Sequence, residues 1–143
     1  MVNFLNIALN SKKIIFNLKN KPLKGFVGPG HYTKKCEEQI LKITKSNYCV
    51  ITTSGTIALS LAALSINLKK NDEIIVPAYG VISTSNAFSS IGLKIKFCEI
   101  DKRTGSISLE YLKKIITKKT KAICFVNFSG YVGNEILKIK KYC

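Results

Sequence analysis

The run Glu73-Ile74-Ile75-Val76-Pro77 decides the fold class of this chain. Its centre is apolar at three consecutive positions. Such a run, without polar alternation, is typical of a strand that is covered on both faces. Strands of this kind belong to parallel sheets with helices on both sides. The flanking residues should therefore supply the helices and the other strands of an α/β domain.

The sequence around this run alternates between β-prone and helical stretches. We predict strands at residues 48–53, 73–77, 94–100 and 121–127, and helices at residues 34–43, 56–66, 83–91, 108–117 and 134–142. Alternation with short connections indicates βαβ units and a mostly parallel sheet. The predicted fold is therefore a three-layer α/β domain with helices on both faces of the sheet.

Polar residues and glycines mark the predicted boundaries. Thr33 and Ser108 stand directly before or at the start of helical runs, and we predict that they are N-caps. For the helix at residues 83–91 we predict a cap at Ser83 or at a nearby residue. Residues 25–30 contain three glycines and a proline, which predicts a loop. We expect residues 1–32 to form an irregular N-terminal segment and residues 33–143 to form the domain.

The net charge of +15 is the extreme feature of the composition. A basic chain can bind nucleic acid or an acidic membrane surface. Here Arg103 is the only arginine, the lysines are spread along the chain, and no aromatic ladder lies between them. No stretch of eighteen apolar residues and no signal peptide are present. We therefore expect a cytoplasmic protein that binds neither nucleic acid nor membrane.

The five cysteines form no C-x-x-C pair, and an odd number does not suit a disulfide framework. Cys49, Cys98 and Cys124 lie in apolar runs, so we expect small buried side chains. His31 is the single histidine and cannot form a metal site alone. The sequence therefore predicts no metal site.

Ser54-Gly55-Thr56 follows the first predicted strand and opens an Ala/Leu-rich helix. A helix N-terminus offers free N–H groups and a partial positive charge, both of which favour a phosphate. Gly55 allows close backbone approach, and the hydroxyls of Ser54 and Thr56 can donate. The alternative is that Ser54 or Thr56 only caps the helix. No P-loop pattern and no dinucleotide-binding glycine pattern is present.

The order of the motifs along the chain carries a resemblance. The series comprises Gly28-Pro29-Gly30, Glu37-Glu38, Ser54-Gly55-Thr56-Ile57-Ala58-Leu59, Asn71-Asp72-Glu73-Ile74-Ile75-Val76-Pro77 and Thr120-Lys121-Ala122-Ile123. This series resembles the DegT/StrS-type family of nucleotide-sugar aminotransferases, which use pyridoxal 5'-phosphate (PLP) and have the aspartate-aminotransferase fold. The resemblance runs from about residue 28 onward and implies an incomplete large domain of that fold.

The resemblance also implies roles for individual residues. Gly55 and Thr56, with Ser54 beside them, match the positions that bind the PLP phosphate. Val81 falls where the family usually has an aromatic ring stacked on the pyridine, so it can give apolar contact but cannot stack. The segment from Asn127 to Gly130 departs from the family's usual His and aromatic residue. The Schiff-base lysine and the aspartate at the ring nitrogen fall beyond these residues, so no catalytic residue is assigned.

The implied function is that of an N-terminal fragment of a sugar aminotransferase-like protein, inactive by itself. In the parent family the substrates are a nucleotide-linked keto-sugar and an amino donor, and the complete protein is expected to be a homodimer. One alternative is a fragment of a PLP-dependent sugar dehydratase. The other is a non-catalytic module that binds PLP or phosphate, or pairs with a full-length relative.

Overall fold

The computed structural model describes residues 30–131 and 134–143, so the predicted irregular segment at residues 1–29 lies outside the described part. The chain divides into two compact units, and the boundary lies between Ile51 and Thr52. Among the described residues, no helix combines the length and the apolar character that a membrane span requires. The domain boundary predicted after residue 32 remains a prediction.

The first unit contains one described helix, α2 (His31–Thr44). The predicted cap at Thr33 is wrong, because the helix begins two residues earlier and Gly30 is its N-cap, without a side-chain hydrogen bond. A glycine is tolerated at this position because it adopts the extended backbone there at little cost. At the other end, Lys45 closes the helix in the left-handed conformation.

The strand predicted at residues 48–53 is wrong, since these residues form no strand. Tyr48 and Val50 are exposed at 90% and 74%. A β-prone run becomes a strand only where another strand accepts its N–H and C=O groups. In the part of the chain that the structure describes, the amide of Ile51 is instead bound by the carboxylate of Glu37, at 3.0 Å.

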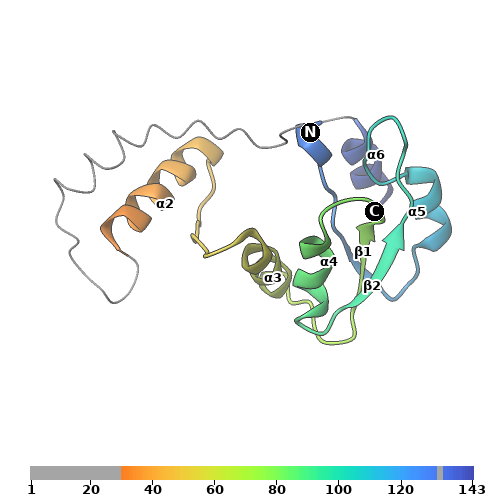
Figure 1. Ribbon diagram of the computed structural model, residues 1–143, viewed down its shortest axis with the longest axis horizontal. Coiled ribbons are helices and arrows are strands. Elements are labelled where there is room, and N and C mark those ends of the chain that lie inside the picture. Colours follow the sequence, from red (N-terminus) through yellow and green to blue (C-terminus); the bar gives the residue numbers. More distant parts are fainter. Residues whose placement is uncertain (1–29, 132–133) are drawn as a thin grey trace, which may run out of the picture. The chain divides into compact units, whose positions relative to one another are not determined.

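The second unit contains a three-stranded parallel sheet (Figure 1). Its strands are β1 (Glu73–Pro77), β2 (Lys94–Cys98) and β3 (Thr120–Ile123), in the order β2-β1-β3. Predicted and observed bounds coincide for β1. Strands β2 and β3 end earlier than predicted. Their pairing with β1 stops at Pro77 for β2 and at Ile75 for β3.

The helices of the second unit are α3 (Gly55–Ser65), α4 (Ile82–Ser89), α5 (Leu109–Ile115) and α6 (Glu135–Tyr142), with a short 3-10 helix, η1 (Phe128–Gly130). Ser108 caps α5 as predicted, and its hydroxyl accepts from the amide of Tyr111 at 3.3 Å. Ser83 itself does not cap α4, and the N-cap is the nearby Val81. Helix α4 starts at Ile82, and Val81 precedes it without a side-chain bond.

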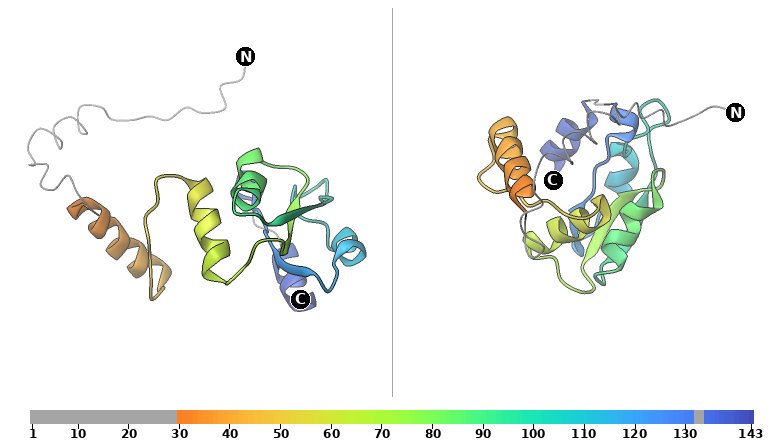
Figure 2. Two further views of the ribbon diagram at one scale, coloured as in Figure 1. Left: turned by 90° about the horizontal axis from the view of Figure 1, so that it is seen from below. Right: turned by 60° about the vertical axis from the view of Figure 1, so that its left-hand side comes forward.

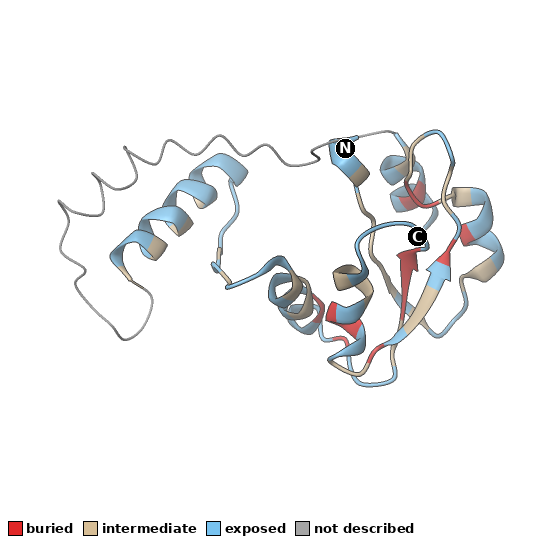
Figure 3. Ribbon diagram, viewed as in Figure 1, coloured by how far each residue is buried: buried red, intermediate tan, exposed pale blue. Residues whose placement is uncertain are grey.

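Alternate residues of β1 enter two separate cores. Ile74 and Val76 pack with residues of α3 and α4, including Ala63 and Phe88. Ile75 packs on the other side of the sheet, in a cluster that contains residues of α5 and α6. Figure 2 shows the two helix pairs on opposite faces of the sheet, and Figure 3 shows burial concentrated on β1 and the helix faces turned toward it. The predicted three-layer α/β architecture is confirmed.

Of the three cysteines expected to be buried, Cys98 at the end of β2 is buried, whereas Cys49 and Cys124 are only partly buried. Cys98 is fully buried, and burial, with the nearby charge of Glu99, raises the pKa of its thiol to about 11. Cys124 is half-buried, and burial raises its pKa as well. Both thiols therefore stay protonated at neutral pH and pack as small apolar groups.

Candidate functional site

The candidate site begins at the N-terminus of α3. The hydroxyl of Ser54 accepts a hydrogen bond from the amide of Ile57 at 3.3 Å, so Ser54 is a helix cap. This cap uses one of the amides in the first turn. The amides of Gly55 and Thr56 have no acceptor inside the helix, because the first turn of any α-helix leaves its N–H groups unpaired. Capping and phosphate binding are therefore compatible here.

Gly55 has no structural requirement to be glycine. Its backbone lies outside the left-handed region, and a Cβ at this position would meet no atom within 4 Å. A glycine inside a helix costs free energy relative to alanine. The open space over this amide is therefore available to a ligand, which a Cβ would keep farther away.

Packing fixes the direction of α3. Ala63, near the end of the helix, lies in one cluster with Ile74 at the start of β1. The N-terminus of α3 therefore points away from the edge at which the strands begin. The hydroxyl of Ser60 donates to the carbonyl of Ala87 at 2.7 Å, which ties α3 to α4 on the same face of the sheet.

A hollow of about 390 Å³ lies beyond the carboxyl end of β1, where ligands bind in sheets of this class. Its wall includes Pro77, Val81, Thr84 and Ser85. The structure thus brings Val81, which is 65% exposed, to the hollow. Ser54, Gly55 and Thr56 do not line it. Residues 54–56 and Val81 thus begin two helices, α3 and α4, that pack on the same face of the sheet, and only Val81 lines the hollow.

An aromatic pair that the sequence analysis did not assign lies at the same edge. Tyr79, after β1, and Phe128, after β3, have ring centroids 4.6 Å apart with a 53° angle between the rings. Ser129 follows in the left-handed conformation, with φ 53°. Both residues lie in loops that follow predicted strands, and this position could have identified the pair, since loops after the carboxyl ends of neighbouring parallel strands lie at the same edge of the sheet.

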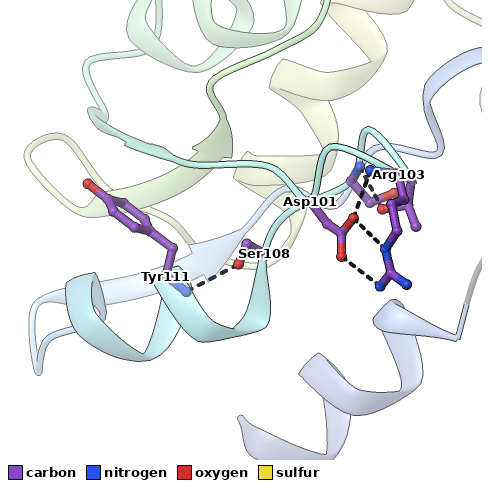
Figure 4. Close-up of polar contacts among 6 residues, drawn as sticks. Asp101, Arg103, Ser108 and Tyr111 are labelled. Atoms are coloured by element: carbon purple, nitrogen blue, oxygen red, sulfur yellow. Dashed lines mark hydrogen bonds and ion pairs between the residues drawn. The ribbon is translucent and has the colours of Figure 1, made fainter.

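The charged pairs lie elsewhere in the second unit. Asp101 and Arg103 pair at 3.2 Å in the loop after β2, and hydrogen bonds from Arg103 hold the pKa of Asp101 below its usual value (Figure 4). Glu73, at the amino end of β1, accepts from Thr120 and pairs with Lys96 at 3.6 Å. A carboxylate at the amino end of the strands supports the sheet and is remote from the ligand edge.

Known proteins match much of this chain in sequence. The chain is 43% identical over 118 residues to GDP-4-keto-6-deoxy-D-mannose 3-dehydratase of Escherichia coli O55:H7, covering 77% of this chain and 30% of the relative. It is 33% identical to GDP-perosamine synthase of E. coli O157:H7, covering 71% of this chain and 28% of that enzyme. The chain thus spans less than a third of the length of these relatives.

Solved structures give the same result. E. coli GDP-4-keto-6-deoxy-D-mannose-3-dehydratase with bound hydrated PLP matches with a TM-score of 0.75 and 37% identity, over 98% of this chain and 36% of that one. Helicobacter pylori PseC, an aminotransferase, matches with a TM-score of 0.78 and 24% identity, over 96% and 36%, which shows the shared fold.

The family comparison covers most of the chain. The model of the DegT/DnrJ/EryC1/StrS aminotransferase family matches residues 11–143, which include residues 54–56, the three described strands and α6. The resemblance found in the order of the motifs is therefore confirmed. The chain belongs to the DegT/DnrJ/EryC1/StrS aminotransferase family.

Proposed function

We propose that this chain supplies the phosphate-binding part of a PLP-dependent enzyme that transfers an amino group to a nucleotide-linked keto-sugar. The observation that carries the proposal is the open N-terminus of α3, where Gly55 exposes its amide although the fold does not require a glycine. The chain spans about 30% of its relatives, so we expect it to need further polypeptide for turnover.

The residues present fit a cofactor phosphate at the α3 terminus. The amides of Gly55 and Thr56 and the hydroxyl of Thr56 would hold the phosphate oxygens, and the helix dipole favours their charge. Val81 would give the cofactor ring an apolar contact without stacking. When bound, PLP supplies an electron sink for carbanion chemistry. The role of this chain is then to bind and orient the cofactor.

A sugar dehydratase is the second candidate function. Two GDP-4-keto-6-deoxy-D-mannose 3-dehydratases, from E. coli O55:H7 and Yersinia pseudotuberculosis, are 43% and 39% identical to this chain. The two GDP-perosamine synthases reach 33% and 31%. This higher identity is the observation that supports the dehydratase as the second candidate. The alternative outside the enzymes is a non-catalytic module, which only binds PLP or phosphate or pairs with a full-length relative.

The family also suggests where the protein acts, its oligomeric state and its substrates. We propose a cytoplasmic protein whose complete form is a homodimer, with a nucleotide-sugar and an amino donor as its substrates. We propose no role in nucleic-acid or membrane binding, since the lysines are scattered rather than gathered with aromatic residues. Steeply salt-dependent DNA binding at low micromolar concentration would contradict this part.

Titration with PLP, followed by amide NMR, tests the phosphate site. We expect the amide signals of Gly55 and Thr56 to shift. Gly55→Ala should weaken the apparent affinity about tenfold, because the Cβ occupies the space over the amide. The same variant should keep or raise the melting temperature, since alanine is the better helix former. Inorganic phosphate should produce the same pattern of shifts, more weakly.

Gly30→Ala is the matched control. Gly30 also stands at a helix N-terminus, before α2, and a Cβ there meets no atom within 4 Å. This variant should leave the PLP shifts unchanged. Shifts confined to lysine side chains, or equal losses in both variants, would contradict the phosphate site. An absorption band of lysine-bound cofactor would contradict the expectation that no lysine of this chain serves the reaction.

A further inference from the structure

The hydroxyl of Ser60 joins α3 to α4, which lie side by side on one face of the sheet (Figure 1). This half-buried hydroxyl lies 2.7 Å from the carbonyl oxygen of Ala87 in α4 and 3.2 Å from that of Thr56 in its own helix. A hydroxyl has one proton to donate, and the shorter distance assigns it to Ala87. A serine inside a helix often bonds only the carbonyl one turn before it, so this link between helices is a specific feature.

The acceptor of this bond needs a side-chain donor. Ala87 lies in the last turn of α4, where a helix leaves its carbonyls without a partner of its own, and it is fully buried. A buried carbonyl without a hydrogen bond costs free energy. Two hydroxyls satisfy this one, from Ser60 at 2.7 Å and from Ser90 at 3.0 Å. Ser90 directly follows α4, so the bond from Ser60 is the one that reaches another helix.

The two helices joined in this way carry the two parts of the proposed cofactor site. Helix α3 begins with Gly55 and Thr56, and Ser60 lies one turn after Thr56. Helix α4 follows its N-cap Val81, which lines the hollow. The apolar contacts between the helices are non-directional, so they allow small shifts of one helix along the other. A hydrogen bond requires a particular distance and angle, and it therefore fixes their relative position.

We propose that Ser60 is a positioning residue, whose hydrogen bond to Ala87 sets the distance between the phosphate-binding terminus of α3 and Val81. The inference rests on the proposed function. A ligand that contacts both parts benefits from this fixed spacing, because binding does not have to hold the two helices in place. A free phosphate contacts α3 alone and gains nothing from the spacing. Ser60 should therefore favour a ligand that joins a ring to a phosphate over phosphate itself.

Amide NMR of the chain, titrated separately with pyridoxine 5'-phosphate and with inorganic phosphate, tests this inference. Pyridoxine 5'-phosphate has the ring and phosphate of the cofactor but no aldehyde, so it does not react with lysines. Ser60→Ala should weaken its binding at least about fivefold, as read from the shifts of Gly55 and Val81. The affinity for inorganic phosphate should change by less than about twofold.

Ser90→Ala is the matched control, because it removes the other hydroxyl from the same carbonyl and leaves the link between the helices in place. Both affinities should stay within about twofold of the wild type. The amide spectra show whether each variant is folded. If Ser60→Ala is not, Ser60→Cys, which is similar in size and a weaker donor, should show the same selective loss.

Three results would overturn the inference and leave the phosphate site intact. They are an unchanged affinity of Ser60→Ala for pyridoxine 5'-phosphate, an equal loss for both ligands, and an equal loss in Ser60→Ala and Ser90→Ala. A wild-type chain that binds neither ligand at Gly55 would instead overturn the proposed function, and this inference with it.

Discussion

At the scale of single residues, Glu73 joins all three strands at the amino end of the sheet. It accepts hydrogen bonds from Thr120 and, at 3.3 Å, from Thr117, and its Oε1 lies 3.6 Å from Nζ of Lys96. The hydrogen bond from Thr120, followed by the charge of Lys96, lowers the pKa of the Glu73 carboxyl despite partial burial. Folding therefore favours the ionised form of this side chain.

Glu73→Gln should lower the free energy of unfolding at pH 7 by about 1 kcal/mol. A lowered pKa in the folded state stabilises the protein above the unfolded-state pKa, and this contribution is lost as the pH falls through the folded-state pKa. The difference between wild type and variant should therefore shrink below about pH 4. Urea unfolding at a series of pH values measures it.

Glu110→Gln provides the control for this prediction. Glu110 pairs with Lys114 at 3.1 Å on α5, and its side chain is 84% exposed. An exposed pair one helical turn apart contributes little, so this variant should leave stability nearly unchanged. A difference between Glu73→Gln and wild type that stays constant from neutral to acid pH would refute the role of the charge.

At the scale of secondary-structure elements, the seven-residue helix α5 depends on its cap. The hydroxyl of Ser108 accepts a hydrogen bond from the amide of Tyr111 (Figure 4). Leu112 of the same helix is fully buried in the core. Ser108→Ala should destabilise the protein by about 1 kcal/mol, because the amide of Tyr111 loses its acceptor. Chemical denaturation measures the change, and hydrogen exchange should locate it in the first turn of α5.

Ser108→Asp separates the cap from other effects of the substitution. Aspartate caps as well as serine does and adds a charge that suits the helix N-terminus. Its stability should equal or exceed that of the wild type. If alanine and aspartate destabilise equally, the packing at this position is the cause and the cap is not.

At the scale of the whole molecule, the net charge of +15 should limit stability. Like charges repel one another in the compact state, and salt screens the repulsion, with a Debye length that falls from about 30 Å at 0.01 M to about 8 Å at 0.15 M. We expect the melting temperature to rise by at least roughly 2 °C over this range of sodium chloride. Scanning calorimetry measures the shift.

Replacing two exposed lysines, Lys118→Glu and Lys119→Glu, tests the same cause without added salt. This variant carries less net charge, so its melting temperature should depend less on salt. An equal dependence in both proteins would show that salt acts through another mechanism, such as a specific anion site.

The local sequence correctly predicted two kinds of feature: a strand that is buried on both faces, and a helix cap whose hydrogen-bond partner lies within one helical turn. The apolar run at residues 73–77 can be stable only between two layers, and it forms β1 with the predicted bounds. Ser108 caps α5 because the cap needs only its own helix. The prediction of a strand at residues 48–53 was wrong. A strand forms only when a second strand pairs with it, and the local sequence does not reveal whether such a partner is present.

Local sequence was enough to predict the α/β class from hydrophobic periodicity and the cap at Ser108 from neighbours within one helical turn, while the family followed from the resemblance carried by the order of the motifs. Only the tertiary structure decided that Val81 lines the hollow while residues 54–56 do not, and that Tyr79 meets Phe128. It also decided the strand order, which places β2 and β3 at the two edges of the sheet within the described residues. These features arise where segments far apart in the chain pack together, and that packing depends on strand order and crossover direction rather than on any local pattern.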